Sequence, residues 1–103
     1  MSDVARQFGD NLVRCRKAAG MSQEELGIRA SLHRTHIGVL ERGERCPQID
    51  TVAKLAGALE VPPSELMDGI VWAPGRTTEG RFIEVAVSGM GAIRRRFQVE
   101  RQD

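Results

Sequence analysis

Apolar residues recur every three or four positions near the start of the chain, which is the spacing of an amphipathic helix. Over residues 4–19 this apolar face carries Phe8, Leu12 and Cys15, and Gly20 follows as a helix stop. We therefore interpret Cys15 as a small buried hydrophobe rather than a reactive thiol. The pattern predicts a first helix over residues 4–19.

The next segment has the start signal of a second helix. Ser22 and Glu25 stand in the positions of a capping box, in which the serine caps the amide of the glutamate and the glutamate bonds back to the serine amide. Leu26 and Ala30 are spaced to face inward. We expect a short helix over residues 23–30.

A third helix is predicted over residues 34–42, after a tight turn. His33 is its expected N-cap, so we interpret this histidine as a capping or solvated residue rather than a catalytic one. Gly43 follows the end of the helix, as glycine commonly does. A loop over residues 44–48 comes next.

Two further helices complete the helical pattern. The fourth is predicted from a cap at Asp50 to Leu59, and Pro62 and Pro63 break the chain before a last helix that starts at residue 63 or 64. The inward stripe of the fourth helix consists of Val52, Leu55, Ala56 and Leu59. Five short helices in residues 1–69 predict a compact all-α domain with one aliphatic core.

Residues 70–103 follow a different pattern. Alternation over 82–87, a glycine-containing turn and a second apolar segment over 92–99 predict a β-hairpin, which residues 70–72 can join as a third strand. A lone hairpin is marginal in water, so we expect it to dock on the fifth helix or to pair with another subunit as a dimerisation element. A flexible tail is the alternative. The arginine run 94–96 is either a solvated strand edge or an arm that contacts DNA.

Composition narrows the function. The chain has 103 residues, two histidines and two cysteines, which leaves no room for a large cofactor-binding fold and matches no zinc spacing or catalytic motif. We therefore expect no enzyme activity, no cofactor and no metal. No segment has the ~18 apolar residues of a membrane helix and the N-terminus lacks a signal peptide, which favours a cytoplasmic protein.

The charge is nearly balanced. The whole chain has 15 basic and 14 acidic residues, and residues 1–69 hold nine of the basic and ten of the acidic ones. Bulk electrostatics therefore cannot hold this protein on nucleic acid, and binding would need a local patch. Residues 29–45, with four arginines against two glutamates, are the best candidate.

The outer face of the third predicted helix suits a DNA groove. A helical wheel places Ile37 and Leu40 toward the core. The opposite arc holds Arg34, Thr35, Gly38, Val39 and Arg42. A glycine in mid-helix costs about 1 kcal/mol relative to alanine, which makes sense where another surface approaches the backbone closely. Arginine pairs with guanine, threonine bonds a base or a phosphate, and valine can touch a thymine methyl. The residue types favour DNA reading, with a protein-facing helix as the alternative.

Three segments carry a family resemblance. SQEEL (residues 22–26), LHRTHI (32–37) and LERGERCP (40–47), continued without a gap through 51–66, resemble the helix-turn-helix of the lambda-repressor-like, Cro/cI-type (XRE) family. With the first helix the resemblance covers residues 8–67. It implies an all-α, five-helix lambda-repressor-like DNA-binding domain, here followed by a short C-terminal β-hairpin extension.

The resemblance also implies roles for single residues. The second helix would cross the DNA backbone while the third enters the major groove. Base reading is implied for Arg34, Thr35, Gly38 and Val39. Backbone contacts are implied for Gln23, His36, Arg42 and Arg45. Arg16 and Glu41 match a structural ion pair that ties the first helix to the third.

The expected function is a sequence-specific transcriptional regulator. We expect a homodimer that reads a palindromic operator in double-stranded DNA, with repression by occluding RNA polymerase as the simplest mechanism and activation by contacting the polymerase as another. Glu44 departs from the family, because lysine is common there, and it lowers the expected DNA affinity. The alternative is a protein-interaction module of the same fold, such as an antitoxin or a regulator acting through partner proteins, which the acidic balance and the apolar Val39 favour.

Overall fold

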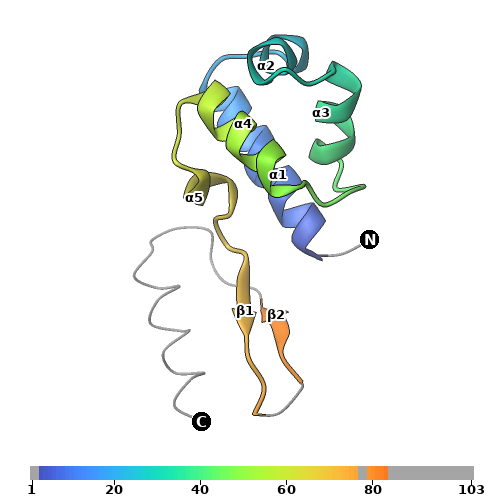
Figure 1. Cartoon of the computed structure of the whole chain (residues 1–103), viewed down its shortest axis with the longest axis vertical. Helices are drawn as coiled ribbons and strands as arrows, with labels where there is room; N and C mark the ends of the chain where they lie inside the picture. The colour runs from blue at the N-terminus through green and yellow to red at the C-terminus, as the bar shows by residue number, and fades with distance from the viewer. Residues whose placement is uncertain (1–2, 77–78, 84–103) are drawn as a thin grey trace. The chain divides into compact units, whose positions relative to one another are not determined.

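The computed structural model describes residues 3–76 and 79–83 of the chain. Within them, five helices precede two short strands (Figure 1). The elements are α1 (Asp3–Ala18), α2 (Gln23–Ala30), α3 (Arg34–Glu41), α4 (Ile49–Leu59), α5 (Pro63–Leu66), β1 (Val71–Ala73) and β2 (Arg81–Ile83). The predicted fold class, five helices followed by a short antiparallel β-extension, is confirmed. The chain divides into two compact units, Met1–Met67 and Asp68–Asp103.

Side-chain caps fix where α2 and α3 begin. At α2 the Glu25 amide donates to Ser22 Oγ at 3.0 Å and the Ser22 amide donates to Glu25 Oε1 at 2.9 Å, which completes the predicted capping box. At α3 the Thr35 amide donates to Nδ1 of His33 at 3.0 Å, so His33 is the N-cap, as predicted. Both caps satisfy amides that a helix start leaves without intrahelical partners.

The start of α4 differs from the prediction. The N-cap is Gln48 rather than Asp50, and its side chain makes no capping hydrogen bond. Asp50 lies within the first turn, where its carboxylate accepts from the Thr51 amide at 2.9 Å and its charge favours the positive end of the helix. Along the same helix Thr51 is buried and Val52 is only half-buried, so the inward stripe begins one residue earlier than expected.

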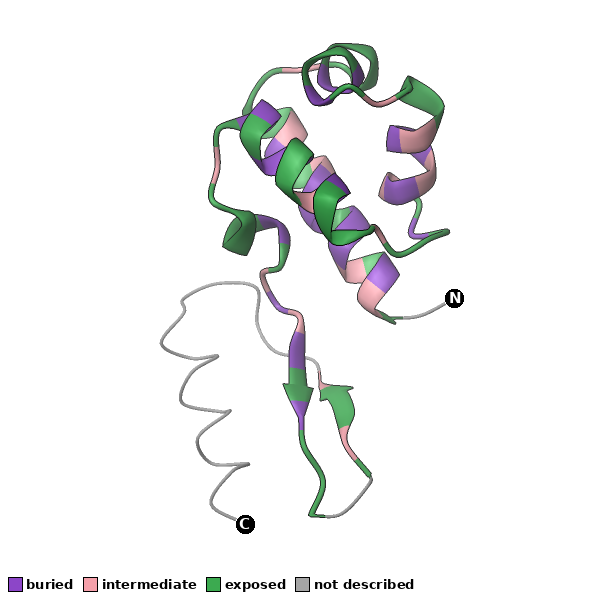
Figure 2. Cartoon of the chain, viewed as in Figure 1, coloured by how far each residue is buried: buried purple, intermediate pink, exposed green. Residues whose placement is uncertain are grey.

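A largely aliphatic core holds the first unit together. α3 packs on α1 and α2, α4 packs on α2 and α5, and α5 packs on α1. Buried residues lie on the sides of the helices that face one another (Figure 2). The largest apolar side chains that are almost fully buried are Phe8, Leu12, Leu26, Ile37, Leu40, Leu55 and Leu66. Inside this core the side-chain amide nitrogen of Asn11 donates to the backbone carbonyl of Leu66 at 2.9 Å. This hydrogen bond connects α1 to the end of α5.

Backbone contact between α1 and α3 requires a glycine. A Cβ at Gly9 of α1 would lie 2.6 Å from the carbonyl oxygen of Leu40 and 2.7 Å from that of Glu41, at the end of α3. Carbon and oxygen atoms cannot approach so closely, so any side chain here would push α3 away. Gly9 thus lets α1 support the last turn of α3 directly.

The second unit contains the described strands. β1 and β2 pair antiparallel, with Val71 opposite Ile83, Trp72 opposite Phe82 and Ala73 opposite Arg81. Part of the predicted third strand, 70–72, is therefore present as β1. The predicted pairing of 82–87 with 92–99, and the arginine run 94–96, lie outside the described residues. In the described part of the chain, no helix has the length and apolar character needed to cross a membrane.

Candidate nucleic-acid interface

α2 and α3 form a helix-turn-helix. They pack on each other across residues 31–33, and Ser31 ends α2 in a left-handed conformation with φ 58°. On α3, Ile37 and Leu40 face the core, as predicted. Arg34 and Thr35 are exposed at the start of the helix. Two side chains of types suited to base edges, Arg34 and Thr35, therefore lie on the solvent-exposed face of α3. His33 caps the start of this helix.

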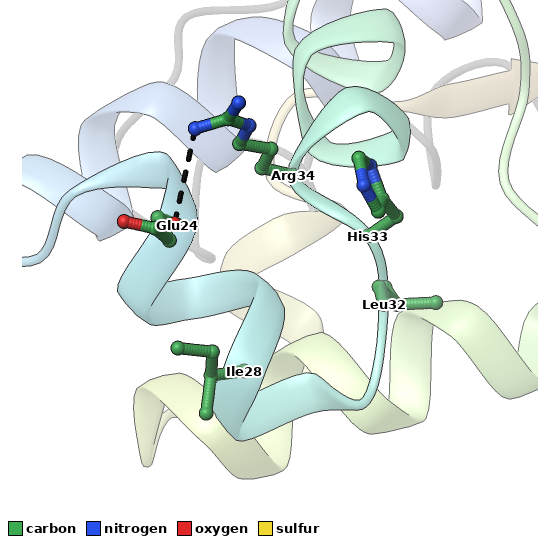
Figure 3. Close-up of a pocket in the computed structure, with 5 residues that line it drawn as sticks. All are labelled: Glu24, Ile28, Leu32, His33 and Arg34. Carbon is green, nitrogen blue, oxygen red and sulfur yellow. Dashed lines mark ion pairs between the residues drawn. The ribbon is translucent and has the colours of Figure 1, made fainter.

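Arg34 is held only loosely. Its NH1 lies 3.8 Å from Oε2 of Glu24, and both side chains are 67% exposed. The pair stands beside an open pocket of about 350 Å³ between α2 and α3, lined also by Ile28, Leu32 and His33 (Figure 3). Exposed ion pairs of this kind contribute little, typically about 0–1 kcal/mol. Arg34 can therefore leave Glu24 for a stronger partner.

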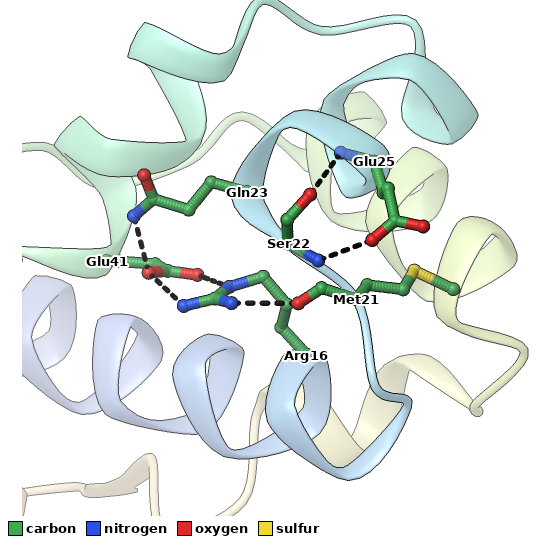
Figure 4. A network of polar contacts seen from close by, with 6 residues as sticks. All are labelled: Arg16, Met21, Ser22, Gln23, Glu25 and Glu41. Carbon is green, nitrogen blue, oxygen red and sulfur yellow. Dashed lines mark hydrogen bonds and ion pairs between the residues drawn. The ribbon is translucent and has the colours of Figure 1, made fainter.

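Arg16, Glu41 and Gln23 form one polar network that joins α1, α2 and α3 (Figure 4). Arg16 donates from Nε to Oε2 of Glu41 at 2.5 Å and from NH2 to Oε1 at 3.1 Å, and its NH1 donates to the Met21 carbonyl at 2.9 Å. The hydrogen bond to Glu41 raises the pKa of Arg16, against the opposing effect of burial. The structure thus brings together the two residues that the resemblance implies as an ion pair.

Gln23 is the exposed member of this network. Its Nε2 donates to Oε1 of Glu41 at 2.9 Å. An amide nitrogen carries two hydrogens, and Glu41 takes only one of them. Gln23 is the first residue of α2, so it stands at the N-terminus of that helix.

Arg42 is the C-cap of α3 and pairs with Glu44 two residues later. Its Nε donates to Oε2 of Glu44 at 2.8 Å and its NH2 donates to Oε1 at 3.3 Å. The hydrogen bond raises the pKa of Arg42 and lowers that of Glu44. Sequence reasoning missed this pairing, although the Arg-x-Glu spacing across a helix end was a usable signal.

Gly38 differs from the expectation that it lies open on the outer face. It is buried, and a Cβ there would lie 3.0 Å from NH1 of Arg42 and 4.0 Å from Nε2 of Gln23. The covering atoms nearest to it are thus flexible polar side chains, not core residues. The side chains nearest to Gly38, those of Arg42 and Gln23, are two for which the family resemblance implies contacts to the DNA backbone.

The remaining predicted positions lie around the same helix. Val39 and His36 are half-buried on α3, and Arg45 is exposed in the loop that follows. Cys46, next to Arg45, is exposed, whereas Cys15 is buried, as interpreted from the sequence. Among the described residues, no group of histidine, cysteine or acidic side chains is placed to hold a metal ion.

Known proteins resemble this chain over the helical region. Residues 12–66, more than half of the chain, match the family HTH_3, described as helix-turn-helix. The control protein C.BamHI of Bacillus amyloliquefaciens is 40% identical over 68 residues, which covers 65% of this chain and 84% of that protein. The HTH-type transcriptional regulator y4dJ of Sinorhizobium fredii is 37% identical over 65 residues, covering 63% of this chain and 84% of that protein.

A solved structure gives the same result. The restriction-modification controller protein C.AhdI from Aeromonas hydrophila matches with a TM-score of 0.59 and 40% identity, covering 60% of this chain and 94% of the controller. The resemblance drawn from the sequence is confirmed. The chain belongs to the HTH_3 family of XRE-type helix-turn-helix proteins and is a DNA-binding transcriptional regulator.

Proposed function

We propose that this protein is a repressor that binds a palindromic operator as a homodimer and reads it with the exposed side of α3. The observation that carries the proposal is the exposure of Arg34 and Thr35 on the first turn of α3, whose start is capped by His33. Arg34 suits the O6 and N7 atoms of guanine, Thr35 suits a base or a phosphate, and Val39 suits a thymine methyl.

Backbone contacts would come from residues around this face. Gln23 and the first amides of α2 can meet one phosphate together, because a helix N-terminus favours anions. His36 and Arg45 would contact neighbouring phosphates, and Arg42 could join them once it leaves Glu44. We expect two to four phosphate contacts per subunit, hence a shallow dependence of affinity on salt, at about 0.9 units of log–log slope per contact.

The short length of α3 supports the proposed dimer, because one such helix can contact only a few base pairs. One short helix reads a half-site, and two half-sites about one helical turn apart form a palindrome. The described strands offer an apolar surface for pairing, because Trp72 and Phe82 are 47% and 49% exposed and stack edge to face at 5.0 Å. We infer that residues 70–103 supply the dimer contact. Trp72 is the only tryptophan, so its emission should shift to the blue as the protein is concentrated.

The relatives support a role in gene control. Two of them are named as control or controller proteins, one of a restriction-modification system. We infer that the chain acts by binding in the cytoplasm rather than by catalysis, and that it represses by excluding RNA polymerase from a promoter. The alternative outcome of the same operator binding is activation of transcription, through a contact with RNA polymerase.

The second candidate function is a protein-interaction module. One observation favours it: three side chains assigned to DNA contact, Gln23, Arg34 and Arg42, already pair with carboxylates of this chain. If DNA does not displace these acids, the face would serve a protein partner instead.

Selection from random duplexes separates the two functions. The repressor proposal expects recovery of a symmetric motif. It expects Arg34→Ala to weaken binding to that motif by about 5- to 150-fold for each half-site, because each subunit loses one bidentate base contact. Arg29→Ala is the matched control, because Arg29 forms an exposed pair with Glu60 on another part of the domain. Recovery of no motif, or equal losses in the two variants, would contradict base reading and favour the protein-interaction module.

A further inference from the structure

The carboxylate of Glu44 occupies one of the two bidentate donor edges of the Arg42 guanidinium, the edge formed by Nε and NH2. Its two oxygens accept from Nε and NH2 at 2.8 and 3.3 Å, which is a bidentate pairing. Carboxylate and phosphate compete for this fork of donors because both present two oxygens at the matching spacing. The Arg42 and Glu44 side chains are 59% and 47% exposed, so solvent and DNA can both reach the pair.

The rest of the guanidinium lies over the bare backbone of Gly38. NH1 would be 3.0 Å from a Cβ at that position. The glycine therefore leaves room for NH1 beside α3 while Nε and NH2 face Glu44. The absence of a side chain at Gly38 and the carboxylate of Glu44 together favour a position of the Arg42 guanidinium against the protein surface.

We propose that Glu44 is an intramolecular competitor of DNA phosphate, which occupies Arg42 and thereby lowers affinity for DNA of any sequence. This inference rests on the proposed role of the α3 face in DNA binding. A phosphate that takes Arg42 must displace Glu44 and lie beside its negative charge. The exchange of one anion for another gains little, so the pair contributes almost nothing to counterion release.

The consequence is a change in what holds the protein on DNA. Phosphate contacts supply nearly all of the sequence-independent affinity. With Arg42 occupied, the base contacts proposed for Arg34 and Thr35 carry a larger share of the binding free energy. The near-balanced charge of the helical unit and the Arg42–Glu44 pair act in the same direction.

The test is the salt dependence of Glu44→Gln on a mixed-sequence duplex of about 20 base pairs, followed by fluorescence anisotropy. Glutamine keeps the shape and removes the charge. The variant should bind more tightly than the wild type, and its log–log salt slope should be steeper by about 0.9 for each bound subunit. With both subunits of the proposed dimer on the duplex the slope should steepen by about 1.8, so the gain in affinity should shrink by about 12-fold between 50 and 200 mM salt.

Two further variants assign the effect to this pair. Glu60→Gln removes the same charge from an exposed pair with Arg29, and it should leave the slope unchanged. Arg42→Gln in the Glu44→Gln background should abolish the gain in affinity and restore the wild-type salt slope. Arg42→Gln alone leaves the Glu44 charge unpaired beside the phosphates, so it should weaken binding.

Each other outcome overturns the inference. An unchanged slope, or weaker binding by Glu44→Gln, would mean that Glu44 does not compete with phosphate, and an equal gain from Glu60→Gln would show only a general charge effect. These results would leave the proposed function intact, provided that the wild type binds. A wild type that binds neither mixed-sequence nor selected DNA would contradict the proposed function and this inference together.

Discussion

Arg16 of α1 and Glu41 of α3 form an ion pair whose side chains are only 13% and 6% exposed. Arg16 bonds both oxygens of Glu41 and also the Met21 carbonyl that precedes α2. Glu41 in turn accepts from Gln23. One contact between α1 and the last turn of α3 therefore also positions the first residue of α2, which connects the core to the face proposed for DNA.

Removing one partner of this pair should be costly. Glu41→Ala leaves a mostly buried guanidinium without its carboxylate, so we expect the free energy of unfolding to fall by about 3 kcal/mol, as for other broken buried pairs. Urea denaturation followed by circular dichroism measures the loss. Glu60→Ala, at an exposed pair, should change stability by less than about 1 kcal/mol. Equal losses in the two variants would show that the Arg16–Glu41 pair does not tie the helices together.

His33 should be replaceable only by another capping residue. Its Nδ1 accepts the Thr35 amide at the start of α3, so His33→Ala should lower the free energy of unfolding by about 1 kcal/mol. His33→Asn restores a short side-chain acceptor and should keep most of the stability. Urea denaturation of the three proteins followed by circular dichroism measures these losses. A loss in His33→Asn as large as that in His33→Ala would contradict the capping role.

Local signals predicted most of the helical unit. The capping box at Ser22, the cap at His33 and the apolar faces of the first and third helices depend on residues near one another in the chain, and the structure has all of them. The prediction that Asp50 is the N-cap of the fourth helix was wrong, because an acidic residue is also favoured within the first turn of a helix. Its role there differs from a cap, yet the sequence signal is the same.

Contacts between residues that are distant in the sequence were harder to predict. Nothing local indicates that Asn11 bonds the carbonyl of Leu66 across the core, or that Glu24 stands opposite Arg34. Arg16 and Glu41 were paired in advance only through the family resemblance. Gly38 was expected to lie open because a wheel gives directions but does not place the Arg42 side chain that covers it.

Gly9 contacts residues of α3 that are distant in the sequence, and this contact can be tested by substitution. Its missing side chain leaves room for the carbonyls of Leu40 and Glu41, so Gly9→Ala should displace the end of α3. A methyl group would usually stabilise an exposed helix interior by about 1 kcal/mol relative to glycine, but here we expect a loss of stability of about 1–3 kcal/mol from overpacking. Gly57→Ala is the matched control, because a Cβ at Gly57 on α4 meets nothing within 4 Å. Urea denaturation should give opposite signs for the two substitutions, and a stabilised Gly9→Ala would show that α1 and α3 do not meet at this point.

The Arg42–Glu44 pair should be visible in the titration of its acid. The hydrogen bond from Arg42 holds the pKa of Glu44 below its ordinary value. A carboxyl with a lowered pKa stabilises the folded state above its ordinary pKa, and this contribution disappears as the pH falls through the lowered value. Both side chains are exposed, so the contribution to stability is small and the titration itself is the better measurement. Carbon-detected NMR of the Glu44 carboxyl should show its midpoint rising toward the ordinary glutamate range, about 4.3, in Arg42→Gln and, by screening, at high salt. A midpoint that neither change moves would mean that Arg42 is not held by Glu44 in solution, and the competition with phosphate would then have no basis.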